Sequence, residues 1–513
     1  PLEVGYQITS EPIAFQFQPE PINPARISRV RVGDLFQGMA RVGYGLYNTP
    51  SAEIYWNSQR SSKQSYGIYG KHFSTQRGVD DIIYSDNSLS QNTLGGFYNR
   101  FYRKFTLQTA VSGSWNKYSY YGTPAPASQA VDADTLDAPF NWYRHYQLEA
   151  SLIESKKKYL GPLKRLDFNY DHLDDNYRSR ENDLGIASSW LLPAEDRPLE
   201  VDFNLSWFGL EHDSLFRGAD SSQLYDSQTF QAHLYPHVSY LSGNFVFDFG
   251  LDLYWQHQTD SRSSQAENPV YFFPEISVTY PLVEGILEAE AGITGEVRRN
   301  TYRQLTQETP YLLPGMDHRP SRELNIFAGL NGKLSSSTSF SLEGGYRQTK
   351  DRALLFRRPD FYSDSARYGL SLRYGQINSF YAQGEISTNL YDNLRISLQA
   401  LVRSLNRADS GLAYHLPWFR SKLSADYTLA DKIRLGTTAQ WIGPRQAFDQ
   451  KANAAIPAML DGYLQLDLSV KYIYNKRISA FVRVHNLLNQ SYQLYLGYPN
   501  QQINFRMGFG YRF

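Results

Sequence analysis

Charged side chains occupy every second position in several stretches of this chain, and their signs are segregated along the sequence. The acidic members lie in the middle: Glu200, Asp202, Asp248, Asp252, Glu288, Glu290 and Glu296. The basic members lie in the last quarter: Arg395, Lys471, Arg483, Arg506 and Arg512. Charged rings in a channel wall determine which ions pass, so one interpretation is a passage with a field between oppositely charged sides. We favour the structural interpretation, because the polar face of a sheet also carries opposite charges that pair across strands.

Two histidines four residues apart, His233 and His237, would suggest metal ligands if they lay on a helix. On a strand they would share a face but lie about 13 Å apart, given the rise per residue. Pro236 also stands between them. We therefore expect no metal site at these residues.

An acidic cluster, Asp171, Asp174 and Asp175, lies near a predicted outer loop. Carboxylates are ligands that calcium prefers, but the spacing lacks the glycine and the terminal glutamate of an EF-hand loop. We expect a solvated loop here rather than a calcium site.

Many tyrosines fall in predicted loops. They include Tyr118, Tyr120, Tyr121, Tyr302, Tyr311, Tyr362, Tyr492 and Tyr495. They could stack against carbohydrate, or they could anchor the chain at a membrane interface and pack among loops. The sequence leaves both interpretations open.

The residue inventory argues against several function classes. The chain has no Cys, which excludes disulfides, thiolate metal sites and cysteine nucleophiles. Its 10 His are dispersed, and it has no nucleophile elbow, metal-protease helix motif or phosphate-binding glycine motif. Lys plus Arg and Asp plus Glu balance at 51 each, unlike the basic footprint of a nucleic-acid-binding protein. We expect no enzyme, no catalytic residue, no cofactor and no nucleic-acid partner.

Around these charges, apolar and polar residues alternate along the chain with a period of two, as in β-strands. In the last stretch, 503–513, apolar side chains fill every odd position, and polar residues or glycines fill every even one. Successive strand side chains point to opposite faces, so one face is wholly apolar. The length suits a tilted transmembrane strand of about 9–11 residues, whose apolar face meets lipid.

The same alternation recurs at 199–207, 245–255, 287–294 and 464–472. Roughly 22 such strands fit between residues 35 and 513, joined alternately by short turns and long links. The first link, Asn48 to Pro50, is short for the side on which long loops are expected, so the count could differ by two at that end. The predicted fold class is all-β: a transmembrane antiparallel barrel with short periplasmic turns and long extracellular loops.

Residues 1–34 differ from the rest because four prolines interrupt them and alternation is weak. Proline lacks an amide donor and is unsuited to a central strand. We expect two parts: a periplasmic or lumenal segment at 1–34, and the barrel at 35–513. With no leader at Pro1, the chain is expected to be a mature form whose export signal has been removed.

The carboxyl end carries Ala480, Val482 and Val484 on one face, then Asn486-Leu487-Leu488-Asn489-Gln490-Ser491-Tyr492 and the last strand. This resembles the closing strands of TonB-dependent receptor barrels, in which an Asn-Leu-Phe-Asn-like element precedes the last loop. Leu488 stands where phenylalanine is usual. The resemblance implies a barrel of the bacterial outer membrane. Family members carry a globular plug before the barrel, which the 34 residues here cannot contain, and no TonB-engaging segment is visible in 1–30.

These patterns predict an outer-membrane transport or channel component without its own plug, whose wide lumen is gated or blocked by folded loops or a partner. The alternative is a structural or accessory barrel subunit of an outer-membrane protein assembly or surface-export complex. The expected partners are outer-membrane lipid and other envelope proteins.

Overall fold

The computed structural model describes residues 36–76, 78–79, 82, 87–122, 138–155, 161–193, 197–212, 225–261, 266–313, 318–362, 365–409, 411–451 and 454–513. The predicted segment 1–34 lies outside these residues. Phe36–Phe513 form one compact unit, the barrel described below.

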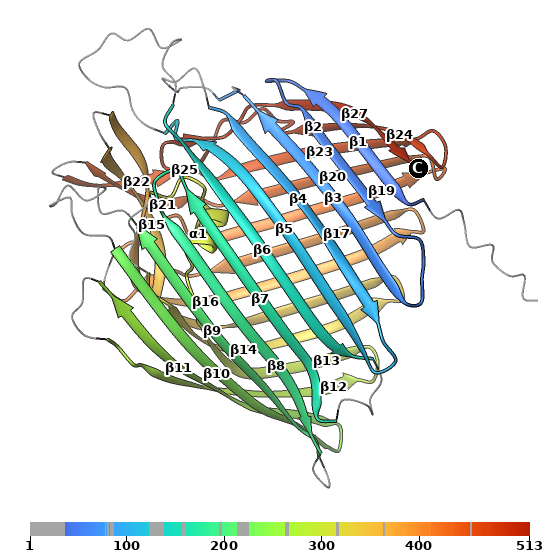
Figure 1. Ribbon diagram of the computed structural model, residues 1–513, viewed down its shortest axis with the longest axis vertical. Coiled ribbons are helices and arrows are strands. Elements are labelled where there is room, and N and C mark those ends of the chain that lie inside the picture. Colours follow the sequence, from blue (N-terminus) through green and yellow to red (C-terminus); the bar gives the residue numbers. More distant parts are fainter. Residues whose placement is uncertain are drawn as a thin grey trace, which may run out of the picture. The chain divides into compact units, whose positions relative to one another are not determined.

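Twenty-two antiparallel strands form one closed ring (Figure 1). They are β1 (Gly38–Gly45), β2 (Ser51–Asn57), β3 (Gln64–Thr75), β4 (Leu89–Phe101), β5 (Phe105–Ser119), β6 (Phe140–Glu154), β7 (Leu163–Asp175), β8 (Arg180–Leu192), β9 (Leu199–His212), β10 (Tyr225–Ser242), β11 (Phe245–Asp260), β12 (Val270–Val283), β13 (Leu287–Arg298), β14 (Ser321–Ser335), β15 (Thr338–Tyr362), β16 (Ser365–Tyr391), β17 (Leu394–Arg403), β19 (Phe419–Leu429), β20 (Ile433–Ile442), β23 (Tyr463–Ile473), β24 (Ile478–His485) and β27 (Asn504–Arg512). The ring closes where β27 pairs with β1, Met507 lying opposite Tyr44.

The two ends of the barrel differ in the length of their links. Turns such as 243–244 and 392–393 define the short-turn end, and links such as 299–320 and 486–503 define the long-loop end. The first link, 46–50, falls at the long-loop end although it is short. The link 176–179 at the same end is also short, so the alternation in length holds for most of the chain but not for every link. The predicted number of 22 strands is confirmed.

Apolar side chains cover the outside of the ring, as the period of two predicts. On β27, Met507, Phe509 and Tyr511 are 52%, 66% and 44% exposed, while Asn504 on the other face is buried. An exposed face of this kind is stable in lipid because the closed ladder satisfies every strand's backbone donors and acceptors. The transmembrane β-barrel fold expected from the sequence is confirmed.

Strands β15 and β16 remain paired as one long hairpin through residues 352–375. Their register shifts between Thr349 and Arg352, where Asp351 adopts a φ of 53°. This bulge absorbs one residue, after which Arg352 pairs with Gly375 and the ladder resumes.

The long links carry further structure. The link after β13 contains α1 (Tyr302–Glu308), the link after β17 contains β18 (Asn406–Arg407), and the link after β20 forms the hairpin of β21 (Arg445–Lys451) and β22 (Ala454–Leu460). Strands β25 (Gln493–Tyr495) and β26 (Tyr498–Pro499) form a small ribbon in the last link. Among the described residues, no helix is long and apolar enough to span a membrane.

Candidate functional site: the inner wall and the loops that cover it

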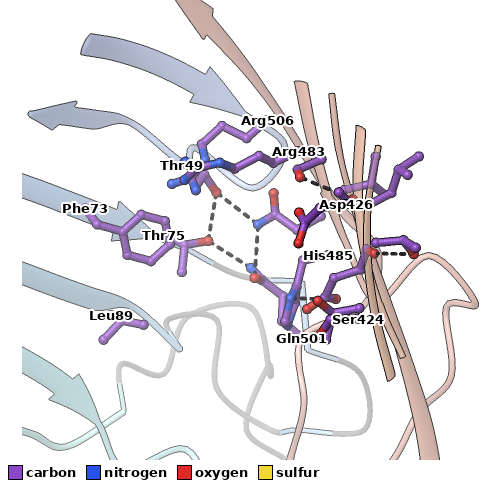
Figure 2. Close-up of a pocket in the computed structure, with 18 residues that line it drawn as sticks. Thr49, Phe73, Thr75, Leu89, Ser424, Asp426, Arg483, His485, Gln501 and Arg506 are labelled. Carbon is purple, nitrogen blue, oxygen red and sulfur yellow. Dashed lines mark hydrogen bonds and ion pairs between the residues drawn. The ribbon is translucent and has the colours of Figure 1, made fainter. Parts of the chain in front are cut away.

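A cavity of about 550 Å³ lies against the inner wall of the barrel (Figure 2). Its lining comes from both sides of the seam between the first and last strands: Thr49, Phe73, Thr75, Leu89, Ser424, Asp426, Gly436, Thr437, Thr438, Asp467, Leu468, Ser469, Arg483, Val484, His485, Gln501, Asn504 and Arg506. Hydroxyls, amides and charges of both signs converge there. The cavity can therefore donate and accept hydrogen bonds to a polar solute, with the Phe73 ring as an apolar surface.

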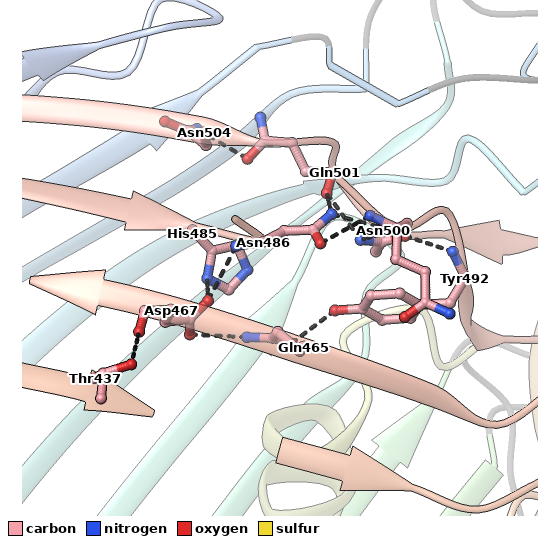
Figure 3. Close-up of polar contacts among 10 residues, drawn as sticks. Thr437, Gln465, Asp467, His485, Asn486, Tyr492, Asn500, Gln501 and Asn504 are labelled. Carbon is pink, nitrogen blue, oxygen red and sulfur yellow. Dashed lines mark hydrogen bonds and ion pairs between the residues drawn. The ribbon is translucent and has the colours of Figure 1, made fainter. Parts of the chain in front are cut away.

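Asp467 organises one side of this cavity (Figure 3). Its carboxylate accepts hydrogen bonds from the Gln465 side chain at 2.9 Å and the Asn486 backbone N–H at 3.0 Å. His485 Nδ1 lies 3.0 Å from the same carboxylate. Position 467 is therefore held by its neighbours on β23 and β24, which fixes the geometry of a carboxylate that borders the cavity.

The motif that carries the family resemblance holds the base of the last link. Asn486 is fully buried and adopts a φ of 52°, a conformation that asparagine tolerates better than most residues. Its amide nitrogen donates to the Gln490 carbonyl at 3.1 Å and the Gln501 carbonyl at 3.2 Å, and its oxygen accepts from the Gln490 N–H. Asn489 accepts from the Ile503 N–H at 2.8 Å. The two asparagines thus fix both ends of the 486–503 link.

The link between β13 and β14 contacts several other parts of the barrel. Tyr302 and Leu305 of α1 pack in one core with side chains of β6, β7, β9 and β10. Further on, the Leu313 N–H donates to the Leu370 carbonyl on β16 at 2.7 Å. The Tyr495 hydroxyl, in the link before β27, donates to the Glu308 carbonyl. These contacts join the α1 link to β6–β10 on one side, to β16 on another and to the last link, so the link lies inside the long-loop end of the barrel.

Tyrosines form the centre of these contacts. Tyr311 stacks on Tyr498 with ring centroids 3.9 Å apart, and the Tyr121 hydroxyl donates to the Pro499 carbonyl at 2.9 Å. Tyr120 and Tyr302 are fully buried. Burial raises the pKa of Tyr121 and Tyr311 above the ordinary value, so both hydroxyls stay protonated and can donate. For these residues the structure favours packing among loops over carbohydrate stacking; the Tyr362 side chain lies outside the described residues.

Two further residues bind the last link to its neighbours. The Arg445 guanidinium donates to the Gln493 and Leu494 carbonyls at 2.6 and 2.8 Å. His415 Nδ1 donates to the Leu355 carbonyl at 3.0 Å, and its Nε2 accepts from the Leu496 N–H at 3.2 Å. This second bond requires a neutral imidazole. Burial, with a smaller contribution from the nearby Arg445 charge, lowers the pKa of His415 to about 4.

The ten residues predicted to line the lumen all lie on strands of the ring. Residues Glu200, Asp202, Asp248, Asp252, Glu288 and Glu290 are on β9, β11 and β13, and Arg395, Lys471, Arg483 and Arg506 are on β17, β23, β24 and β27. In a closed ring of 22 strands, β11 and β27 are half a circumference apart. The strands that carry the acidic residues, here called the acidic wall, and most of the strands that carry the basic residues, the basic wall, therefore lie on opposite sides of the ring.

The acidic wall has partners of its own. His237 lies 3.2 Å from Glu200, His233 lies 2.5 Å from Asp252, and the Ser239 hydroxyl donates to Asp248. The two histidines thus contact different carboxylates. No group of described residues has the geometry to hold a metal ion.

The expectation of a solvated acidic loop is wrong for Asp171 and Asp175, which are each 4% exposed. The link that carries α1 covers them: the Tyr302 hydroxyl donates to Asp175 at 2.8 Å, and the Arg303 guanidinium lies 3.7 Å from Asp171. Asp174 instead pairs with Arg144 on the neighbouring strand. The three carboxylates therefore do not converge.

His415 and Arg445 were not singled out from the sequence. Both lie in polar links, and their partners are mainly backbone groups of residues far along the chain. No residue-type pattern marks such bonds, so only the folded arrangement shows them.

Solved structures with the same fold are outer-membrane receptors and transporters. The ferric-catecholate import receptor Fiu of K12 E. coli, in its closed form, superposes with a TM-score of 0.69 and 11% identity over 94% of this chain and 82% of that one. The FrpB iron transporter of Neisseria meningitidis gives 0.70 and 12% over 94% and 82%. The ferripyoverdine receptor of the Pseudomonas aeruginosa outer membrane, bound to ferripyoverdine, gives 0.66 and 14% over 93% and 72%.

The fold is that of these receptor barrels. The architecture implied by the resemblance to TonB-dependent receptors is confirmed, and the outer-membrane location expected from the sequence agrees with it. No family model matches the chain, and no curated protein matches it.

Replacing Asn486 with leucine should loosen the 486–503 link. The change removes three hydrogen bonds of a buried side chain and forces a branched residue to a positive φ, at a cost of about 2–4 kcal/mol. Hydrogen–deuterium exchange of peptides covering 487–503 should become at least tenfold faster. Leu488→Ala, at an exposed neighbour, is the matched control. Equal exchange in the two variants would show that Asn486 does not hold the link.

Proposed function

We propose that this protein is a transport component of the bacterial outer membrane, which admits a polar solute into its lumen when the long links move aside. The observation that carries the proposal is the α1 link, which contacts β6–β10, β16 and the last link inside the long-loop end. The cavity at the β27–β1 seam lies on the inner wall and supplies polar groups for a solute.

The hydrogen bonds that hold the long links together can be replaced by hydrogen bonds to water. They join side chains to backbone carbonyls of other links, as in the Arg445–Gln493 and Tyr121–Pro499 contacts. Neutral bonds of this kind contribute about 0.5–1.5 kcal/mol each and those from a guanidinium about 1.5–3 kcal/mol, so the closed arrangement can open without unfolding the strands. Loops joined in this way suit a gate better than a permanent seal.

Replacing Arg445 should increase the passage of ions through the barrel. In Arg445→Gln, the shorter neutral side chain loses its charge-assisted bonds to the last link, and channel openings in planar bilayers should become at least several-fold more frequent than in the unaltered protein. Met459→Gln changes an exposed residue of the same hairpin and should leave conductance unchanged. A barrel that stays closed in every variant, even after bound partners are stripped, contradicts passage and favours the accessory-subunit alternative.

Passage should also depend on pH through His415. When the links are closed, the His415 imidazole stays neutral down to about pH 4. When the links open and the imidazole is exposed to water, it protonates near its ordinary pKa of about 6.5. The closed state is therefore fully stable above pH 6.5 and loses stability as the pH falls toward 4, by about 3 kcal/mol at most.

Conductance should accordingly rise between pH 6.5 and 4 in the unaltered protein. In His415→Gln, which cannot protonate, this rise should be reduced, because the other contacts of the link remain. The same pH response in both proteins would assign it to other groups.

A further inference from the structure

A second cavity, of about 400 Å³, lies on the inner wall toward the short-turn end. Arg41 of β1, Arg434 of β20, Lys471 of β23 and Arg483 of β24 line it, and Asp426 is the one carboxylate in its lining. Arg434 is the second residue of its strand, and Lys471 is two residues from the end of its own. The cavity adjoins the first one, with which it shares Asp426, Gly436, Ser469 and Arg483, and it extends from there toward the short-turn end.

Like charges face each other directly in this wall. Arg434 pairs with Lys471 between β20 and β23, and Arg483 pairs with Arg506 between β24 and β27. Directly opposed like charges destabilise a sheet. Two pairs of opposed cations on neighbouring strands repel each other, so nearby negative charge is needed to stabilise this part of the sheet.

Elsewhere in the barrel, opposed like charges receive that counter-charge from the chain. Asp171 and Asp183 are cross-strand neighbours, and Arg299 binds Asp183 with two bonds of 2.9 Å. In the same way, Arg322 lies opposite Lys350 and pairs with Asp351.

The basic wall does not follow this rule. Among the described residues, Arg41 pairs with Glu53 at 3.0 Å, but no ion pair joins Arg434, Lys471, Arg483 or Arg506 to a carboxylate. The opposing acidic wall, by contrast, has histidine and serine partners. Internal contacts therefore account for three acidic-wall carboxylates, Glu200, Asp248 and Asp252. Among the described residues of the basic cavity, Asp426 is the one carboxylate beside several cations that have no ion-pair partner of their own.

The guanidiniums are positioned by an aromatic ring. Arg41 and Arg483 lie over the Phe481 ring at 5.8 and 5.3 Å from its centroid, and Phe481 itself is buried. Cation–π contacts of this kind hold a guanidinium while leaving its N–H groups available. Planar guanidiniums suit bidentate binding of phosphate or carboxylate oxygens.

We propose that this wall is a binding site for a compact oxyanion that carries two or more negative charges on phosphate or carboxylate groups. The inference rests on the proposed transport function and narrows its substrate class: the solute is anionic and meets this site near the short-turn end of the passage. The opposing acidic wall repels the same anion and so keeps it on the basic side.

The test is equilibrium binding of two probes, inorganic pyrophosphate and citrate, to the purified full-length protein in detergent, measured by calorimetry. At least one probe should bind, and its affinity should fall as ionic strength rises. The double variant Arg434→Gln/Arg483→Gln should weaken binding at least tenfold. Lys422→Gln, which removes a cation lining a different part of the inner wall, should change it less than twofold.

Preference for pyrophosphate or for citrate identifies the group that the site recognises. Absence of binding by both probes, or equal loss in the Lys422 control, overturns the proposal. Circular dichroism of each variant verifies that the barrel is folded. The result is independent of the loop experiments: binding without conductance contradicts only the transport function, and conductance without anion binding contradicts only this site.

Discussion

The hydrogen bonding of the backbone in lipid is the constraint on which this structure depends. A strand in hydrocarbon must pair on both edges, so the sheet has to close, and here it closes through β27 and β1. Closure separates an outer face in lipid from an inner face in water. Each strand must then alternate, which is why Met507 and Phe509 point outward while Arg506 lines the inner cavity. The segregated charges on the inner wall follow from that alternation.

A ring of 22 strands encloses a wide lumen, and part of it is occupied by the protein's own links. The α1 link contacts β6–β10, β16 and the last link, and Arg445 and His415 tie that last link to its neighbours. The links therefore narrow the long-loop end, whereas the basic cavity lies toward the other end. Under the proposed transport function, a solute entering from the long-loop end would meet these links first and the basic cavity second.

The strands could be predicted from the sequence because their signal is local: a period of two is visible within ten residues, as in 503–513. The loops could not, because their bonds join distant residues, such as Tyr121 and Pro499, 378 positions apart. The same limit explains the wrong expectation for Asp171, whose burial depends on Arg303 and α1. The charge segregation was visible in sequence, but the like-charge pairs required the register of β20, β23, β24 and β27.

The most direct test of the account is the labelling of single cysteines on the two faces of one strand, which is straightforward because the chain has no Cys. Leu398 and Gln399 of β17 are neighbours with exposed side chains that point to opposite faces. In lipid vesicles, Leu398→Cys should resist a water-soluble maleimide and carry a fluorophore quenched by a lipid-borne nitroxide, whereas Gln399→Cys should react with the maleimide. Equal reaction of both cysteines with the aqueous reagent would contradict a lipid-facing outer surface and a water-filled interior.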